Sequence, residues 1–258
     1  MTRISKAFYD KKAFVGFLTA GDPDISTTEQ LIYEMERAGA GIVEIGIPFS
    51  DPIAEGPVIQ EANLRALSVE GGCTINMIFE LVEKVRKQSE IPLVFLTYLN
   101  PIYQYGYQEF AKKAKEAGLD GVIIPDLPYE EQEEILPYLK EENVDLISLI
   151  APTSKERIQM IAKRAKGYIY LVSSMGVTGT RNVFSDQIDD MIAKIREVSN
   201  TPIAVGFGVN TPSQVRSLCE KADGVIVGSA IVKLIGEYGK KAKRPVYDYI
   251  KSMTTEME

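Results

Sequence analysis

The 258-residue chain is 45% hydrophobic and 25% charged, the composition of an ordinary globular protein that is long enough to bury a substantial core. Its formal net charge of −7 argues against binding to nucleic acid or to an anionic membrane surface, although an anionic small molecule is not excluded. The first twelve residues lack an apolar signal segment, and no stretch approaches the roughly 20 apolar residues that span a bilayer, so we expect a cytoplasmic protein.

Short apolar runs recur along the chain, with amphipathic helical patterns between them. Most of these runs are continuously apolar, which is typical of parallel strands buried on both faces. The predicted strands are Ala13–Leu18, Gly41–Ile45, Pro92–Thr97, Gly121–Ile124, Asp145–Ile150, Tyr168–Ser173, Pro202–Val205 and Gly224–Val227. The predicted helices include Thr27–Ala38, Ile75–Lys87, Tyr107–Ala117, Tyr129–Glu141, Lys155–Ala165, Ser185–Val198 and Thr211–Cys219.

This alternation of strands and helices predicts an α/β fold. An open, doubly wound sheet would alternate in the same way, but eight strand–helix pairs in this length favour a closed (β/α)8 TIM barrel. No linker, low-complexity tract or charge block divides the sequence. We therefore expect one barrel domain over residues 1–258, with extra short helices.

Two residue types that often carry enzyme chemistry are absent or scarce. The chain has no histidine, so no imidazole can serve as a base, a nucleophile activator or a metal ligand. Its two cysteines, Cys73 and Cys219, are expected to be free thiols of a reducing compartment, although one bridge between them remains open. We therefore expect no metal site, and acid–base chemistry falls to carboxylates, lysine or tyrosine.

Two strand-to-helix connections are longer than the others. The first runs from Gly46 to about Thr74 and contains a helical stretch near Val58–Leu67, and the second runs from Ser174 to Ser185. In a barrel these connections emerge at the carboxyl-terminal rim, where active sites lie, and long glycine-containing loops there are candidate lids. The alternative is that each is a tolerated surface insertion.

The second predicted strand contains one acidic residue, Glu44, within the run Ile42-Val43-Glu44-Ile45. Strand alternation directs Val43 and Ile45 toward the helices and Glu44 into the barrel, near the carboxyl end of the strand. Burial there would raise the pKa of the carboxyl group and suit it to proton transfer near neutral pH. The alternative is a polar core residue that is paired with a neighbour.

The connection after this strand carries two more carboxylates, Asp51 and Glu55, in a segment restricted by three prolines and a glycine. Such a segment presents its side chains in defined directions, so Glu44 and this loop could supply an acid–base pair at the rim. The alternative is structural: Asp51 would bind nearby amides, and Glu55 would favour the positive end of the next helix.

Glycine-containing segments follow the last three predicted strands. They are Gly176-Val177-Thr178-Gly179, Gly206-Phe207-Gly208 and Gly228-Ser229. Glycine allows a ligand to approach the backbone closely, and a helix beginning near Ser229 would direct its free N–H groups at an anion. Any one of these segments is more simply a turn. Because barrel enzymes often hold phosphate after strands seven and eight, the segments together predict a phosphate site.

A series of longer motifs runs in order from about Phe14 to Leu234. The motifs are Phe17–Pro23 (FLTAGDP), Glu44–Pro52 (EIGIPFSDP), Thr97–Pro101 (TYLNP), Pro125–Pro128 (PDLP), Ile150–Pro152 (IAP), Ser173–Gly179 (SSMGVTG), Gly206–Gly208 (GFG) and Gly228–Val232 (GSAIV). Together they closely resemble the signature stretches of tryptophan synthase alpha subunits. The resemblance covers most of the chain.

The resemblance implies a lyase of tryptophan biosynthesis that reversibly cleaves indole-3-glycerol phosphate to indole and glyceraldehyde 3-phosphate, with no metal or organic cofactor in this subunit. Glu44 matches the family's proton-transferring glutamate. Glu55 stands where the family most often has a catalytic aspartate, and its side chain is one methylene longer. The resemblance assigns substrate contacts to Phe17, Leu96, Tyr98, Ile123, Ile150, Tyr170 and Thr178, and phosphate contacts to Gly179, Gly208, Gly228 and Ser229.

The resemblance also implies a partner and leaves alternatives open. Pro48, Asp51 and Asn100 match regions that face a beta subunit, a pyridoxal-phosphate enzyme that receives indole within an alpha2-beta2 heterotetramer. Thr178 and Gly179 match a mobile loop that closes over the substrate. The alternatives are a related lyase that releases free indole without a partner, a weakly catalytic barrel that activates the beta subunit, and another phosphosugar barrel that shares only the phosphate site.

Overall fold

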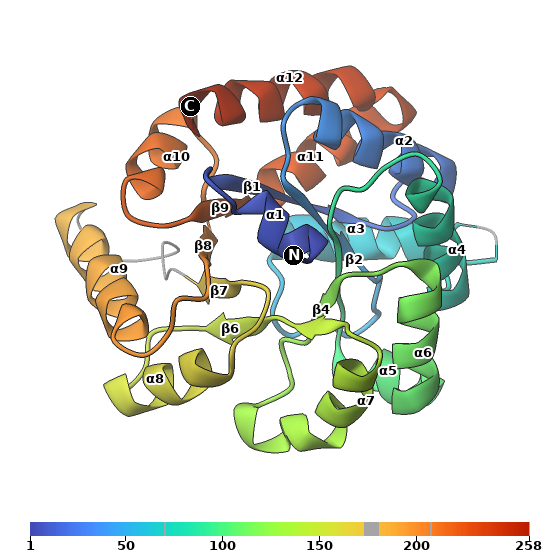
Figure 1. Cartoon of the computed structure of the whole chain (residues 1–258). Helices are drawn as coiled ribbons and strands as arrows, with labels where there is room; N and C mark the ends of the chain where they lie inside the picture. Colours follow the sequence, from blue (N-terminus) through green and yellow to red (C-terminus); the bar gives the residue numbers. More distant parts are fainter. Residues whose placement is uncertain (70, 173–180, 207, 258) are drawn as a thin grey trace.

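The structure, a computed structural model, describes residues 1–69, 71–172, 181–206 and 208–257, with the backbone alone at 181–186 (Figure 1). Nine parallel strands in the described residues form one sheet, in the order β5-β4-β3-β2-β1-β9-β8-β7-β6. The strands are β1 (Ala13–Thr19), β2 (Ile42–Gly46), β3 (Leu93–Leu96), β4 (Gly121–Ile123), β5 (Asp145–Leu146), β6 (Ser148–Ile150), β7 (Ile169–Val172), β8 (Ile203–Gly206) and β9 (Gly224–Val227).

The two ends of this sheet, β5 and β6, are consecutive in the chain and are separated only by Ile147. The backbone N–H of Ile147 still donates to the carbonyl of Val122 at 2.9 Å, so the chain continues along β4 between the two short strands. β5 and β6 are therefore two halves of the predicted strand Asp145–Ile150, and they close the sheet into an eight-position barrel. The prediction of a (β/α)8 barrel is confirmed.

Helices surround the sheet (Figure 1). The α-helices are α1 (Arg3–Ala7), α2 (Ile25–Arg37), α3 (Pro57–Leu67), α4 (Ile75–Arg86), α5 (Leu99–Tyr105), α6 (Tyr107–Ala117), α7 (Leu136–Glu141), α8 (Lys155–Arg164), α9 (Arg181–Arg196), α10 (Pro212–Cys219), α11 (Ser229–Tyr238) and α12 (Lys243–Thr254). Short 3-10 helices are η1 (Tyr129–Glu134), η2 (Gly239–Lys241) and η3 (Thr255–Met257).

Two predicted helices differ from the observed ones. The segment predicted as one helix over Tyr129–Glu141 is a 3-10 helix followed by α7, with the change at Ile135. Pro137 lies in the first turn of α7, where its missing N–H is tolerated, and this residue could not continue a helix from η1. The helix predicted from Ser185 begins four residues earlier, at Arg181.

The barrel interior is filled by small and branched apolar side chains, closed at one end by α1. Ile4 and Ala7 of this helix are buried in the same cluster as interior residues of the strands, such as Val15, Ile42 and Val94. Figure 1 shows α1 lying across the end of the barrel near the N-terminus. The floor of the barrel is therefore a packed core, which leaves the opposite, carboxyl-terminal end for a site.

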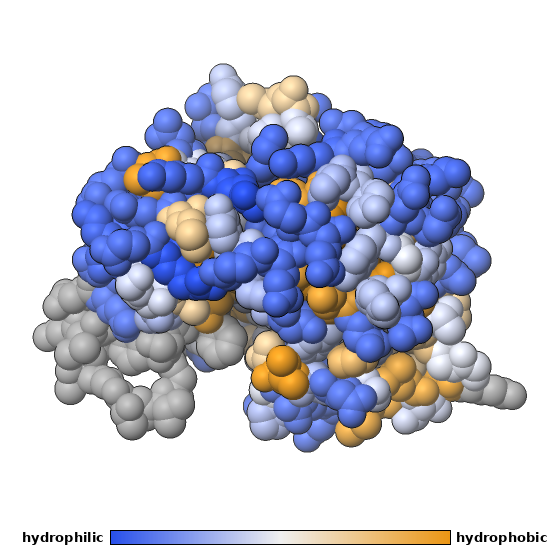
Figure 2. Space-filling view, turned by 90° about the horizontal axis from the view of Figure 1, so that it is seen from below, coloured by the Kyte–Doolittle hydropathy of each residue, from blue (hydrophilic) through white to orange (hydrophobic). Residues whose placement is uncertain are grey.

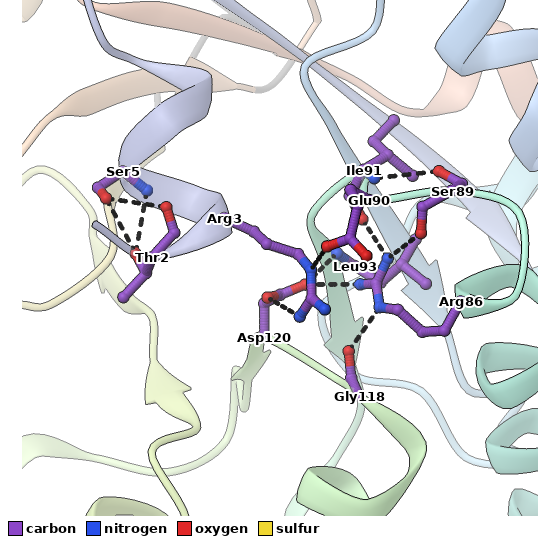
Figure 3. Close-up of polar contacts among 10 residues, drawn as sticks. All are labelled: Thr2, Arg3, Ser5, Arg86, Ser89, Glu90, Ile91, Leu93, Gly118 and Asp120. Atoms are coloured by element: carbon purple, nitrogen blue, oxygen red, sulfur yellow. Dashed lines mark hydrogen bonds and ion pairs between the residues drawn. The ribbon is translucent and has the colours of Figure 1, made fainter.

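A network of ion pairs and hydrogen bonds lies at this closed end of the barrel (Figure 3). Arg86 pairs with Asp120 at 2.6 Å, and each side chain is only 10% exposed. The Arg86 guanidinium also donates to the carbonyl of Gly118 at 2.7 Å, while Asp120 accepts from the N–H of Leu93 at 2.9 Å. Arg3 of α1 reaches the same carboxylate at 3.2 Å. The network thus connects α1, which closes this end of the barrel, to the starts of β3 and β4.

The face shown in Figure 2 is mostly hydrophilic, with hydrophobic residues in separate small patches. Within the described ranges, no helix combines the length and apolar character that crossing a membrane requires. Cys73 and Cys219 are both free, as predicted, and both are buried.

Candidate active site

Glu44 lies in the middle of β2 with its side chain inside the barrel. The strand register pairs it with Phe17 on β1 and with Val94 on β3, and Val94 belongs to the interior core. Val43 and Ile45 pack in the outer, helix-facing cluster instead. The side chain of Glu44 is only 1% exposed, so the alternation of the strand places a carboxyl group where water is almost excluded, as predicted.

The two oxygens of the Glu44 carboxyl group differ. Oε1 accepts a hydrogen bond of 2.6 Å from the hydroxyl of Tyr168, whereas Oε2 is buried without a hydrogen-bond partner. Burial raises the pKa of Glu44 to about 7, and the Tyr168 hydrogen bond opposes part of that rise. The group therefore exchanges its proton near neutral pH, and one oxygen is left to meet a ligand. Tyr168 was missed as a site residue, because nothing local in the sequence links it to Glu44.

Tyr98 organises the loop that carries Glu55. Its hydroxyl accepts hydrogen bonds from the backbone N–H groups of Ile53 at 2.9 Å and Ala54 at 2.8 Å, and it donates to the carboxylate of Glu55. The two accepted bonds fix the orientation of the hydroxyl, so its only proton points at Glu55. The loop and β3 are thereby joined at the carboxyl-terminal rim, next to the end of the strand that holds Glu44.

Glu55 and Tyr98 titrate away from their ordinary ranges. The pKa of Glu55 is raised, chiefly by partial burial; the hydrogen bond from Tyr98 opposes part of this rise, and the nearby charge of Asp126 adds to it. Burial and the Glu55 carboxylate raise the pKa of Tyr98 to about 12, so its hydroxyl stays protonated and remains a donor. Asp126 is itself held by the N–H of Leu99 at 2.9 Å. Sequence reasoning missed Asp126, although it lies within a motif that follows the fourth strand.

Apolar side chains form a wall on the Glu44 side of the barrel. Phe17 is buried in a cluster with Val58 and Ile59 of α3, and Leu96 packs against the same cluster. Gly46 makes room for this wall, because a Cβ at that position would lie 2.7 Å from the Phe17 ring. Ile123 lies in the interior core beside these residues. The predicted contacts Phe17, Leu96 and Ile123 therefore share one side of the interior.

Tyr170 faces the same interior from β7. Its register partner Ala204 belongs to the interior core, and a Cβ at Gly206 would lie 2.7 Å from the Tyr170 ring. Burial, followed by the charge of Glu44, raises the pKa of Tyr170 above its ordinary value. On the neighbouring strand, Leu149 pairs with Tyr170 and packs against the interior core. Ile150 instead packs in the outer cluster, because alternation turns it toward the helices.

The predicted phosphate segments after β8 and β9 lie side by side, because these two strands are neighbours in the sheet. Gly228 is the N-cap of α11 and Ser229 its first residue, and no side chain caps this helix. The N–H groups of Ile231 and Val232 bond back to the carbonyl of Gly228, so the other N–H groups of this first turn are those of Ser229 and Ala230. Gly208 is exposed and has a φ of 80°.

The remaining predicted residues differ in exposure. Pro48 is buried, whereas Asp51 and Asn100 are exposed, on the connection after β2 and on α5. Thr178 and Gly179 lie outside the described residues. Large apolar side chains are exposed on the same two elements, with Ile53 at 81% and Tyr103 at 66%. Exposed apolar side chains therefore lie on the same elements as Asp51 and Asn100, two of the three predicted interface residues.

Comparisons with known proteins agree with one another. Residues 5–258 match the family described as "Tryptophan synthase alpha chain". The tryptophan synthase alpha chain of Lacticaseibacillus casei is 44% identical over 253 residues, which cover 98% of this chain and 94% of the relative. That of Lactiplantibacillus plantarum is 46% identical over 254 residues, which cover 98% and 95%.

Solved structures give the same result. Tryptophan synthase subunit alpha from Legionella pneumophila has a TM-score of 0.90 at 36% identity, with 100% of this chain and 98% of that chain covered. A chain from the tryptophan synthase α2β2 complex of Pyrococcus furiosus has a TM-score of 0.87 at 38% identity, with 95% and 99% covered. The resemblance deduced from the motifs is confirmed, and this chain belongs to the tryptophan synthase alpha chain family.

Proposed function

We propose that this chain is a carbon–carbon lyase that reversibly cleaves indole-3-glycerol phosphate to indole and glyceraldehyde 3-phosphate in tryptophan biosynthesis. The observation that carries the proposal is Glu44, a buried carboxyl group whose pKa is raised to about 7 and whose Oε2 has no partner. A group that is half-protonated near neutral pH can give a proton in one step and take one in the next.

Glu44 performs both proton transfers. Its protonated form gives a proton to C3 of the indole ring, which makes the ring cationic and weakens the bond to the glycerol carbon. The resulting carboxylate takes the proton of the hydroxyl on that carbon. The aldehyde forms, the carbon–carbon bond breaks, and its electron pair restores the aromatic ring. Tyr168 holds Oε1 at 2.6 Å and leaves Oε2 for both transfers.

Glu55 stabilises the cationic ring from the other side. As a carboxylate it accepts the indole N–H, and its negative charge offsets the positive charge that develops on the ring. The hydrogen bond from Tyr98 supports the charged form and fixes the position of the carboxylate. The Tyr98 hydroxyl reaches the carboxylate of Glu55 at the end of its longer side chain, so the loop can hold a glutamate in place of the usual aspartate.

The other site residues bind the two ends of the substrate. Phe17, Leu96, Ile123 and Tyr170 surround the indole ring, which requires an apolar pocket. Gly208, Gly228 and Ser229 bind the phosphate together with Gly179, using backbone N–H groups at the start of α11. The family resemblance adds Thr178, which lies outside the described residues, to the substrate contacts. The chain itself needs no metal or organic cofactor for these steps.

The lyase works in the cytoplasm with a beta subunit that carries pyridoxal phosphate, in an alpha2-beta2 heterotetramer. The solved Pyrococcus furiosus structure concerns the mutual activation of the tryptophan synthase α2β2 complex. That relative therefore works with a partner, which supports this part of the proposal. On this chain the partner contacts the surface of Asp51 and Asn100, where Ile53 and Tyr103 expose apolar area. Pro48 shapes the base of that loop from a buried position.

The test is the rate of indole-3-glycerol phosphate cleavage by the full chain, with and without a beta subunit. We expect slow cleavage that rises with the partner and disappears in Glu44→Gln. Glu61→Gln, which removes an exposed carboxylate on α3, serves as the control and should keep full activity. A folded chain that binds and activates the beta subunit but cleaves no substrate would show that it acts as an activator alone.

A further inference from the structure

A second buried polar atom without a partner lies on the strand next to Glu44. Thr19 is the last residue of β1 and is 1% exposed, and its Oγ1 makes no hydrogen bond. Among the side chains that the structure describes, Thr19 Oγ1 and Glu44 Oε2 are the two buried atoms in this condition. Buried hydroxyl groups are normally paired, so two unpaired atoms on adjacent strands point to a shared ligand.

The side chain of Thr19 faces the barrel interior. Val15 on the same strand belongs to the interior core, and Phe17 pairs in register with the inward-facing Glu44. Every second residue of a strand faces the same side, so Thr19 faces the interior as well. Thr19 lies two residues beyond Phe17, roughly 7 Å nearer the carboxyl-terminal rim. Its register partner is Gly46, which has no side chain that could bind the hydroxyl.

The neighbouring polar groups are already satisfied by one another. The hydroxyl of Thr28 donates to the carbonyl of Asp24 at 2.9 Å and accepts from the N–H of Gly21 at 3.0 Å. Asp22 receives two hydrogen bonds from Arg65, at 2.9 and 2.8 Å. These polar groups of the turn after β1 are therefore bound to one another or to Arg65, and none of them binds the hydroxyl of Thr19.

We propose that the hydroxyl of Thr19 hydrogen-bonds a hydroxyl group on the glycerol chain of the substrate. The inference rests on the proposed function. Glu44 acts on the indole-bearing carbon, and the phosphate binds at the rim, so the glycerol chain spans the level at which Thr19 lies. A threonine hydroxyl can donate and accept at once, and it therefore suits a substrate hydroxyl. Thr19 selects a hydroxylated chain over a deoxygenated one, because only the former satisfies its buried oxygen.

The test compares two ligands by calorimetry in a Glu44→Gln background, in which no turnover interferes. One ligand is indole-3-glycerol phosphate, and the other is indole-3-propanol phosphate, which has the same ends but no hydroxyl between them. Thr19→Val should weaken binding of the first ligand about 10-fold and leave that of the second within about twofold. Thr19→Ser, which restores the hydroxyl, should recover most of the loss.

Thermal stability separates a binding role from a structural one. Thr19→Val removes an unpaired buried hydroxyl at nearly constant volume, so its Tm should equal or exceed that of the parent. Thr28→Val is the matched control, because it removes a paired hydroxyl. It should lower Tm and leave the ratio of the two affinities unchanged.

Equal losses for the two ligands in Thr19→Val, or no loss for either, would overturn the inference and leave the lyase proposal intact. A Tm well below that of the parent, with no rescue by Thr19→Ser, would also overturn it. A Glu44→Gln chain that binds neither ligand while it stays folded would overturn the proposed substrate and this inference together.

Discussion

Glu44→Gln should make the folded chain more stable at alkaline pH while it abolishes cleavage. In the wild-type chain the pKa of Glu44 rises from 4.5 to about 7 on folding. Between these values the folded chain keeps a proton that the unfolded chain has lost, so the wild type loses stability as pH rises through this window. Each tenfold change in proton affinity corresponds to about 1.4 kcal/mol, so the full loss is about 3 kcal/mol.

Glutamine removes this dependence, because it has no proton to lose and can still accept the Tyr168 hydrogen bond through its amide oxygen. Urea denaturation of both chains at several pH values between 5 and 8.5 measures the effect. Other titrating groups cancel in the difference between the two unfolding free energies. That difference should shift by about 2 to 3 kcal/mol in favour of the variant across this range, since about a quarter of the full effect is already present at pH 5.

The exposed carboxylate of Glu61 provides the control, since Glu61→Gln should change the difference by less than about 0.5 kcal/mol over the same range. Parallel pH profiles for wild type and Glu44→Gln would refute the reasoning. They would mean that Glu44 ionises as easily in the folded chain as in the unfolded one, which its burial does not allow. The proposal that Glu44 exchanges protons near neutral pH would then lose its physical basis.

Three further perturbations test the site and its scaffold. Glu55→Asp withdraws the carboxylate from the Tyr98 hydroxyl, so kcat/KM for cleavage should fall on the order of 10- to 100-fold without loss of stability, and an unchanged rate would show that the hydrogen bond is dispensable. Arg86→Ala leaves the buried carboxylate of Asp120 with its longer ion pair to Arg3 and removes the hydrogen bond to the carbonyl of Gly118; urea denaturation should show a loss of about 3 kcal/mol, with kcat of the folded fraction unchanged. Gly46→Ala places a methyl group 2.7 Å from the Phe17 ring and should lower stability by about 1–3 kcal/mol, and adding Phe17→Leu should recover part of that loss if the clash is its cause.

The sequence alone determined the barrel and the position of its central carboxylate. Eight apolar runs predicted the strands to within a residue or two, because strands buried on both faces are apolar throughout and this pattern is local. The inward direction of Glu44 followed from the two-residue alternation of a strand, which needs no knowledge of the rest of the fold. The motifs identified the family for the same reason, since each lies within a short stretch of chain.

Only the tertiary structure decided which groups meet. Tyr168, which binds Glu44, is 124 residues away in the chain, and the two become neighbours only when the barrel closes at Ile147. The inward turn of Leu149 in place of Ile150 likewise depends on the pairing of its strand with β7. The unpaired hydroxyl of Thr19 is visible only once every neighbouring donor and acceptor has been assigned. Periodicity along a chain records which face of an element is buried, whereas hydrogen-bond partners and pKa values depend on groups that folding brings together from distant positions.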